Sequence, residues 1–336
     1  MNDIYVLMYR FFPGTNKLSN ILLEQDSIRK MVLELIDMDR SPTITRLIKK
    51  DLPDIVVSTY LFHTHALVRL RREMGLNFKI YTVVADPWTM NPVSFAPEAE
   101  KNIVYDEVGV KMGKKYDVPE KNILKTGWWV RPEMYDKKIQ TSNFKLLKKR
   151  GWGIEDGRQV VFVGGGSLGT NAILKFLPVL LLVKTKVAVV FNTGTDKLAY
   201  NTVEQYCKLL KSLGKDKLVQ IINLGWIDDM ASVLSACDIV FGKAGPNFLF
   251  DVVAVGKPFV AITHIGGQED GNIDLIKQKK LGWIREHGNS AASFFLRYLN
   301  SPKSFQDKYR TYIAKEARNN EKGLEKVWKS VEKEMM

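Results

Sequence analysis

The chain has 336 residues, of which 45% are hydrophobic and 26% charged, a globular composition long enough for two domains. Its longest apolar run, residues 176–183, is interrupted by Pro178 and is too short to cross a membrane. No basic segment precedes a long apolar one at the N-terminus, so we expect no signal peptide and a cytoplasmic protein. Cys207 and Cys237 belong to no CxxC motif or Cys/His cluster, so we expect reduced thiols and no metal site.

The formal net charge is +13, and the basic residues gather in TRLIKK, RLRRE, KMGKKY and FKLLKKRGW. Any one of these clusters is more often a solvated helix face. Together they indicate an anionic partner, either a nucleotide, an acidic membrane surface or nucleic acid. The sequence has no RNA-binding aromatic signature, no zinc-finger spacing and no helix-turn-helix pattern, so we expect no nucleic acid.

Short β-branched runs alternate with helical patterns along most of the chain. The candidate strands are, in order, DIVVST, KIYTVVAD, NIVYD, NILKTG, VVFVGG, VAVVFNTG, VQIINLG, DIVFG, PFVAIT and GWIRE. Most of them are continuously apolar, which is typical of parallel strands buried on both faces. Helical segments between them include THALVRLRREMG, NAILKFLPVLLLVK, TVEQYCKLLKSLG, DMASVLSAC and NIDLIKQKKLG. This alternation predicts a doubly wound α/β fold.

A polar and basic stretch without a strand candidate, MYDKKIQTSNFKLLKKRGWGIEDGRQ, interrupts the series before it restarts at Val160. We therefore expect two Rossmann-like domains with parallel sheets, at residues 1–138 and 139–310. The charged, amphipathic end of the chain predicts a helical tail at residues 311–336.

Three polar or glycine-rich corners follow strand candidates of the second domain, at residues 164–167, 243–247 and 266–272. Ligands of open α/β sheets bind at the carboxyl ends of the strands, where such corners lie. Each corner alone is equally consistent with a tight turn, a first-turn acid favoured by the helix dipole, or a polar surface loop. Three of them on one sheet edge make that purely structural interpretation weaker.

The residue types in these corners suit a nucleotide and a sugar. Gly165, Gly166 and Ser167 permit close backbone approach, and the helix that follows favours phosphate at its N-terminus. Asp251, about one turn into the helix after the second corner, can accept hydrogen bonds from two ribose hydroxyls. The fit to the dinucleotide pattern GxGxxG is imperfect, and the Walker pattern GxxxxGK is absent.

The segment DIVFGKAGPNFLFDVVAVGKPFVAITHIGGQEDGN resembles the nucleotide-sugar segment of glycosyltransferase family 28, which includes diacylglycerol glucosyltransferases and monogalactosyldiacylglycerol synthases. The family pattern is roughly K-[AP]-G-x(5)-E-A-x(2)-G-x-P, a strand, and then G-Q-E-x-x-N. The matching residues are Lys243, Gly245, Asp251, Gly256, Pro258, Gly267, Gln268, Glu269 and Asn272. The resemblance implies that Asp251 binds the ribose and that Gln268 and Glu269 hold the donor sugar.

Further site residues are implied by the same resemblance. It implies that Gly165, Gly166 and Ser167 lie near the diphosphate, and that Trp226 and Ile227 contact uracil through their backbone. KKDLPDIVVSTYLFHTHAL, VVADPW and ILKTGWWVRPEMYD resemble family segments too, so the likeness covers about residues 45–300. It implies the GT-B fold, in which two Rossmann-like domains face a cleft and C-terminal helices cross back.

The implied chemistry is an inverting sugar transfer from a UDP-sugar, with no cofactor and no metal in the catalytic step. Asp86, at the end of a strand candidate, is the candidate base, and the alternative is a carboxylate that only caps the turn before Pro87. His65 matches a histidine of the galactolipid synthases and is the second catalytic candidate, although a lone histidine is more often structural.

The sequence departs from the family in two places. Asp251 replaces the family glutamate and two phenylalanines, Phe248 and Phe250, replace small hydroxyl residues, which tightens and dries the ribose corner. The start, MNDIYVLMYRFFPGTNKLSN, lacks the family's first strand and glycine-rich loop and looks more like a helical segment from inside the first domain. Either the chain lacks its first strand and helices, or it has diverged there.

Three functions remain open from the sequence. The leading hypothesis is a transferase bound peripherally to an anionic membrane surface, which moves a hexose from a UDP-sugar to a lipid acceptor of the diacylglycerol type. The second is a nucleotide-sugar-binding subunit or inactive homologue that needs a partner chain to complete the N-terminal domain. The third is a UDP-sugar 2-epimerase, whose acidic and histidine motif is not evident here.

Overall fold

The computed structural model of the chain describes residues 15–138, 152–154, 157–164 and 170–335. Their contacts divide the chain into two units. Unit 1 comprises Met1–Trp129, Gly266–Gly271 and Lys322–Met336, and unit 2 comprises Val130–Ile265 and Asn272–Glu321. The boundary between the units therefore lies after Trp129, whereas the sequence suggested a boundary after residue 138. Residues 322–336, which the sequence placed in a separate helical tail, belong to unit 1.

Unit 1 contains a parallel sheet in the order β1-β2-β3-β4. Its strands are β1 (Ile55–Ser58), β2 (Lys79–Val83), β3 (Lys101–Val104) and β4 (Ile123–Lys125). Its helices are α2 (Thr15–Leu23), α3 (Asp26–Asp51), α4 (Leu61–Met74), α5 (Glu107–Lys115) and α16 (Gly323–Met335), with the 3-10 turns η1 (Pro92–Ser94) and η2 (Glu120–Asn122). The expected lack of a first strand and glycine loop falls mostly on residues 1–14, outside the described residues; α2 begins directly after them.

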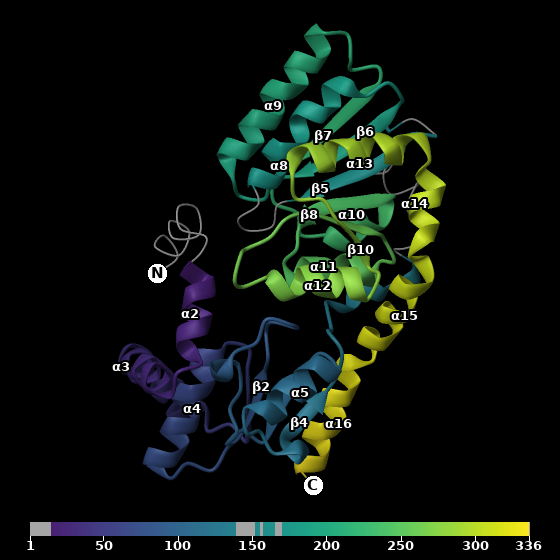
Figure 1. The fold of residues 1–336 in the computed structure, drawn as a ribbon. Coiled ribbons are helices and arrows are strands. Elements are labelled where there is room, and N and C mark those ends of the chain that lie inside the picture. The colour runs from purple at the N-terminus through teal and green to yellow at the C-terminus, as the bar shows by residue number, and fades with distance from the viewer. Residues whose placement is uncertain (1–14, 139–151, 155–156, 165–169, 336) are drawn as a thin grey trace. The chain divides into compact units, whose positions relative to one another are not determined.

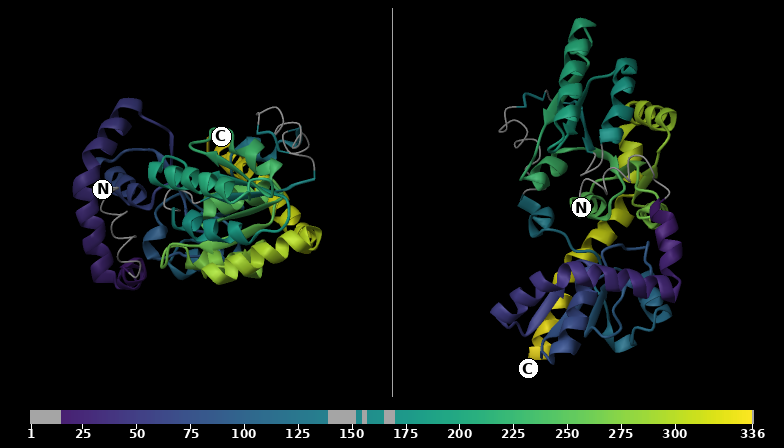
Figure 2. Two further views of the ribbon diagram at one scale, coloured as in Figure 1. Left: turned by 90° about the horizontal axis from the view of Figure 1, so that it is seen from above. Right: turned by 90° about the vertical axis from the view of Figure 1, so that its left-hand side faces the viewer.

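The last helix of the chain, α16, covers one face of the unit 1 sheet (Figures 1 and 2). Val327 of α16 is buried with Tyr81 of β2 and Ile103 of β3. The Tyr81 hydroxyl also donates to the backbone oxygen of Ser330 at 3.1 Å. A Cβ atom on Gly323 would lie 2.9 Å from the Thr126 oxygen, so only glycine allows this close approach.

Unit 2 contains six parallel strands in the order β10-β9-β8-β5-β6-β7. The strands are β5 (Gln159–Gly164), β6 (Val187–Asn192), β7 (Val219–Leu224), β8 (Ile239–Lys243), β9 (Phe259–Thr263) and β10 (Gly282–Ile284). The helices are α8 (Thr170–Phe176), α9 (Lys197–Ser212), α10 (Met230–Ala236), α11 (Pro246–Ala254), α12 (Asp270–Gln278), α13 (Gly288–Asn300), α14 (Pro302–Lys308) and α15 (Arg310–Glu321), with the 3-10 turns η3 (Pro132–Tyr135) and η5 (Leu177–Leu182).

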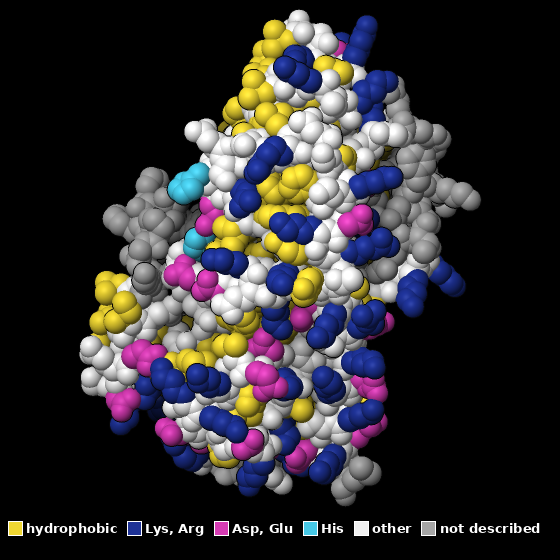
Figure 3. Space-filling model, turned by 45° about the vertical axis from the view of Figure 1, so that its right-hand side comes forward, with side chains coloured by type: hydrophobic (Ala, Val, Ile, Leu, Met, Phe, Trp, Pro, Cys, Tyr) yellow, Lys and Arg dark blue, Asp and Glu magenta, His cyan; other side chains and the backbone are white. Residues whose placement is uncertain are grey.

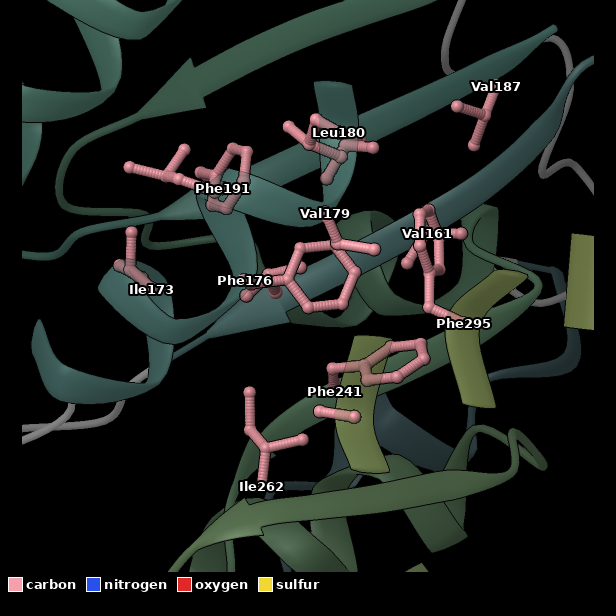
Figure 4. Close-up of a cluster of buried hydrophobic side chains, with 14 of the residues drawn as sticks. Val161, Ile173, Phe176, Val179, Leu180, Val187, Phe191, Phe241, Ile262 and Phe295 are labelled. Carbon is pink, nitrogen blue, oxygen red and sulfur yellow. The ribbon is translucent and has the colours of Figure 1, made fainter. Parts of the chain in front are cut away.

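An aromatic core packs α8, α9 and α13 on one face of this sheet (Figure 4). The ring centroid of Phe176 in α8 lies 5.0 Å from that of Phe241 in β8 and 4.8 Å from that of Phe295 in α13. Val161 of β5 points into the same core, whereas its neighbour Phe162 contacts a ring of α11. Both faces of the strands are therefore covered, as their continuously apolar sequences require.

All ten strand candidates of the sequence are strands in the structure, and both sheets are parallel, so the predicted α/β class is confirmed. The helix expected at NAILKFLPVLLLVK differs, because α8 ends at Phe176 and continues as the 3-10 turn η5. Pro178 lacks the backbone N–H that an α-helix would need there, which accounts for the break.

Candidate functional site

In the unit 2 sheet, the order in which successive strands are added reverses between β5 and β8. These two strands are neighbours, and the later connections proceed outward from them on both sides. Such a switch point creates a crevice at the carboxyl ends of the strands, where open α/β sheets bind ligands. Gly164 ends β5 beside Gly242 of β8. Gly165, Gly166 and Ser167 follow directly but lie outside the described residues, so their contact with a diphosphate stays a prediction.

An aromatic ring closes over the two glycines at this point. A Cβ atom on Gly242 would lie 2.6 Å from Cε1 of Phe248 and 2.7 Å from the Gly164 oxygen. The Phe248 ring itself packs against Phe162 and Phe259, each with its centroid 5.9 Å away. Phe248 therefore fills space above the strands that side chains at the glycine positions would otherwise occupy.

The second corner joins β8 to α11. The pairing of β8 with β9 shifts register between Gly242 and Lys243, and Lys243 is buried. Gly245 is the N-cap of α11 and Pro246 its first residue, so backbone N–H groups at this helix start point toward the strand ends. A helix N-terminus beside a switch point is a favourable place for the charge of a phosphate.

Asp251, the predicted ribose ligand, lies on α11 with a largely buried side chain. Burial raises the pKa of its carboxyl group to about 6, and Arg131 beside η3 opposes part of that increase. The closest oxygen lies 3.9 Å from Nη2 of Arg131, which is half-exposed and hence a weak partner. Arg131 was not among the candidate residues, although it stands in the quoted segment ILKTGWWVRPEMYD.

The third corner, between β9 and α12, is fixed by its own polar groups. Gly267 has φ of 81° and its N–H donates to Oδ1 of Asp270 at 3.0 Å. Glu269 is 3% exposed. Asn272, 1% exposed, donates from Nδ2 to the Ala244 oxygen at 2.9 Å and so ties α12 to the second corner. A contact of Asn272 with the nucleotide-sugar stays a prediction.

Unit 1 holds a cavity of 190 Å³ that brings two candidate residues together. Asp86, after β2, and Gln268 both line it. The remaining lining residues are Ser19, Asn20, Leu23, Leu61, Phe62, Thr89, Asn91, Val93 and Ser94. The cavity thus combines a carboxylate and several amide and hydroxyl groups with an apolar side, which suits a ligand that has both polar and apolar parts.

His65 has a different environment from Asp86. It lies on α4, and its Nε2 donates to the Val93 oxygen of η1 at 2.9 Å, because a carbonyl can only accept. The residues lining the cavity include Val93 but not His65. The structure therefore gives His65 a contact that supports the cavity wall, and its catalytic role stays a prediction.

Trp226 and Ile227 follow β7, beyond β6 from the switch point. The Trp226 side chain is 73% exposed and donates from Nε1 to Oδ1 of Asp228. Asn192 of β6 donates from Nδ2 to the Gly225 oxygen at 2.9 Å and thereby orients the start of this loop. The contact of this loop's backbone with uracil, which the resemblance implies, stays a prediction.

Two features are absent from the part of the chain that the structure describes. Within residues 15–138, 152–154, 157–164 and 170–335, no group of three or more His, Cys, Asp or Glu side chains is arranged to hold a metal ion. None of the helices in this part of the chain combines the length and apolar character needed to cross a bilayer.

Comparison with known proteins relates the chain to glycosyltransferases. Residues 160–286 match the glycosyltransferase family 28 C-terminal domain. The chain is 25% identical over 243 residues to monogalactosyldiacylglycerol synthase 1 of Arabidopsis thaliana, covering 68% of this chain and 42% of the synthase. It is 27% identical over 218 residues to the UDP-N-acetylglucosamine–N-acetylmuramyl-(pentapeptide) pyrophosphoryl-undecaprenol N-acetylglucosamine transferase of Carboxydothermus hydrogenoformans, covering 65% and 54% of the two chains. The chain therefore spans about half the length of these relatives.

Solved structures resemble the fold of most of the chain. Anabaena HepE, crystallised with UDP and glucose, superposes with a TM-score of 0.56 at 13% identity, over 87% of this chain and 81% of HepE. Acinetobacter baumannii MurG gives a TM-score of 0.56 at 14% identity, over 85% and 73% of the two chains. The fold is GT-B, with two Rossmann-like units that each carry a parallel sheet.

Proposed function

We propose, on the premise that residues 160–286 are a glycosyltransferase family 28 C-terminal domain, that this chain transfers a hexose from a UDP-sugar to a lipid acceptor. The observation that carries the proposal is the row of corners at the carboxyl ends of β5, β8 and β9, which are adjacent strands. UDP and glucose are present in the HepE structure, and the names of the two relatives above contain diacylglycerol and undecaprenol.

In the proposed mechanism, the acceptor hydroxyl oxygen bonds to the anomeric carbon opposite the leaving group. The bond from that carbon to the diphosphate oxygen breaks, and UDP leaves with the electron pair. Asp86 takes the hydroxyl proton, and the N-terminus of α11 stabilises the charge that develops on the diphosphate. Gln268 and Glu269 hold the sugar hydroxyls, Asp251 holds the ribose, and no cofactor takes part.

Peripheral binding to an anionic membrane is part of this proposal. Leu18, Ile21 and Leu22 are exposed on α2, whereas Ser19 and Asn20 of the same helix line the cavity with Asp86. An apolar helix face next to the cavity would bring a lipid acceptor close to the base. On the face in Figure 3, basic side chains are interspersed with acidic ones, so the excess positive charge there is dispersed.

We expect Asp86→Asn to lower kcat about 10²- to 10⁴-fold, because an amide cannot accept the acceptor's proton. The dissociation constant for UDP should not change, since no part of UDP contacts this residue in the proposed mechanism. Transfer from UDP-glucose and UDP-galactose would be measured on anionic liposomes that contain diacylglycerol, and UDP binding by calorimetry. Asp216→Asn, an exposed aspartate after α9, is the matched control. An Asp86→Asn enzyme with the wild-type kcat would exclude Asp86 as the base.

The wild type in the same assay also separates the alternative functions. Interconversion of the UDP-sugars without a lipid would identify an epimerase. Binding of UDP without any transfer would support a nucleotide-sugar-binding subunit that needs a partner chain. Absence of UDP binding would contradict the nucleotide-sugar assignment itself, and the glycine corners would then be structural turns.

One observation favours the partner-dependent alternative. In the described part of unit 1, β1 pairs with β2 on one side only, and Val57 on β1 is 50% exposed. A largely apolar hollow of 440 Å³ runs along β1 between α3 and α4. An open strand edge beside an apolar hollow is a surface to which a further strand can add.

A further inference from the structure

We propose that Asn20 and Thr89 are positioning residues that clamp the loop at residues 266–271 and so hold Gln268 beside Asp86. The inference rests on the proposed function, in which Gln268 and Glu269 bind the donor sugar. The contacts that carry it all lie within unit 1, which includes this loop.

The first contact fixes the start of the loop. Asn20 of α2 donates from Nδ2 to the Gly267 oxygen at 2.8 Å, and its Oδ1 accepts from Nδ2 of Asn91 at 2.9 Å. Asn91 is itself oriented, because its Oδ1 accepts from the Val93 N–H at 3.0 Å. A neutral amide is the side-chain group that donates and accepts at this geometry at once, so an alanine or an aspartate at position 20 loses the bond to Gly267.

The second contact fixes the end of the loop. The Gly271 N–H donates to Oγ1 of Thr89 at 2.9 Å. Because this N–H lies in the first turn of α12, the helix cannot satisfy it internally, and Thr89 supplies its acceptor. A Cβ atom on Gly271 would lie 2.5 Å from the Trp88 carbonyl carbon, which requires glycine at this approach.

Three residues of the loop, Gln268, Glu269 and Asp270, lie between the two contacts. Gln268 lines the same cavity as Asn20, Thr89 and Asp86. Gly267 occupies the left-handed region, which glycine enters and leaves at little cost, so outside contacts add to the internal Gly267–Asp270 hydrogen bond in keeping one conformation. Asn20 and Thr89 supply these contacts, and the sugar then meets a preorganised loop.

This role predicts a selective loss of affinity. We expect Asn20→Ala and Thr89→Val each to weaken UDP-hexose binding about 5- to 10-fold, the effect of one neutral hydrogen bond. Binding of UDP alone should not change, because its proposed contacts lie at other corners of the site. Thr89→Ser keeps the hydroxyl group and should retain wild-type affinity.

The test combines hydrogen exchange with calorimetry. Exchange of the 265–272 backbone amides would be measured without ligand in the wild type, the three variants and two controls, Asn201→Ala and Thr202→Val on α9. Dissociation constants for UDP, UDP-glucose and UDP-galactose would follow by calorimetry. We expect faster exchange in this segment in Asn20→Ala and Thr89→Val only.

A different experimental result contradicts each part of the proposal. Unchanged exchange in both Asn20→Ala and Thr89→Val overturns the clamp. Faster exchange with unchanged UDP-hexose affinity, in an enzyme that binds UDP-hexose, overturns its role in holding the sugar. A wild type that does not bind UDP contradicts the proposed function, and the ligand-free exchange data still decide whether the loop is clamped.

Discussion

Asp251 is a carboxyl group that the fold removes from water without giving it a close partner. Arg131 is 3.9 Å away and half-exposed, so desolvation dominates and the pKa rises to about 6. Between pH 4 and pH 6 the native protein therefore keeps a proton that the unfolded chain has released. The free energy of unfolding therefore falls as the pH rises through this range. Above it, the buried and charged carboxylate continues to lower the stability of the native protein.

We expect Asp251→Asn to remove this pH dependence. Relative to the wild type, the variant should gain on the order of 2–3 kcal/mol of unfolding free energy between pH 4 and pH 7.5, since two pKa units correspond to about that amount. Urea unfolding of both proteins at the two pH values measures the difference, and Asp216→Asn, which is exposed, serves as the control. A stability difference that stays constant with pH would show that Asp251 has an ordinary pKa.

The sequence allowed single site residues to be predicted where the chemistry is local. Asp251 and Gln268 stand in one short pattern, so the sequence alone makes them candidates, and their roles stay predictions. Asn20 gave no such signal, because its partner Gly267 is 247 residues away in the chain. Thr89 and Gly271 are separated by 182 residues. Contacts of this kind depend on the finished fold and leave no periodic pattern in the sequence.

At the scale of elements, the strands were predictable and some helices were not. A strand such as β5 is a continuous apolar run bounded by polar residues, which identifies it in isolation. The helix α3 has an almost even distribution of apolar residues around its axis, so it shows no clear helical stripe. The place of α16 was not predictable either, because its apolar face does not indicate which sheet it covers.

The packing of α16 leads to a testable expectation. Val327→Ala should destabilise unit 1 by about 2 kcal/mol, because it removes buried methyl groups from the contact with Tyr81 and Ile103. For a unit of this size the corresponding decrease in Tm is roughly 4–8 °C, measurable by calorimetry. Leu324→Ala on the same helix removes more apolar volume from an exposed position and should change Tm little. Equal effects of the two variants would contradict the proposed packing.

At the scale of the whole molecule, each unit has its own core and the proposed nucleotide contacts lie in unit 2. UDP at 100 times its dissociation constant should add about 2.7 kcal/mol to the stability of the unit that binds it. We therefore expect UDP to slow hydrogen exchange in β5 and β8 and to leave β1 and β3 unchanged. ADP, which carries the same diphosphate on another base, is the control. Equal protection of all four strands would contradict a nucleotide site confined to unit 2.

The position of α16 has a consequence for synthesis on the ribosome. The strand β4 ends at Lys125 and α16 begins at Gly323, so roughly 200 residues separate the sheet from the helix that covers it. At 5–20 residues per second, translating that interval takes about 10–40 s. During this time the nascent sheet exposes Tyr81 and Ile103 to other chains. A deletion of α16 would make this exposure permanent, even though every residue of the unit 2 sheet would still be translated.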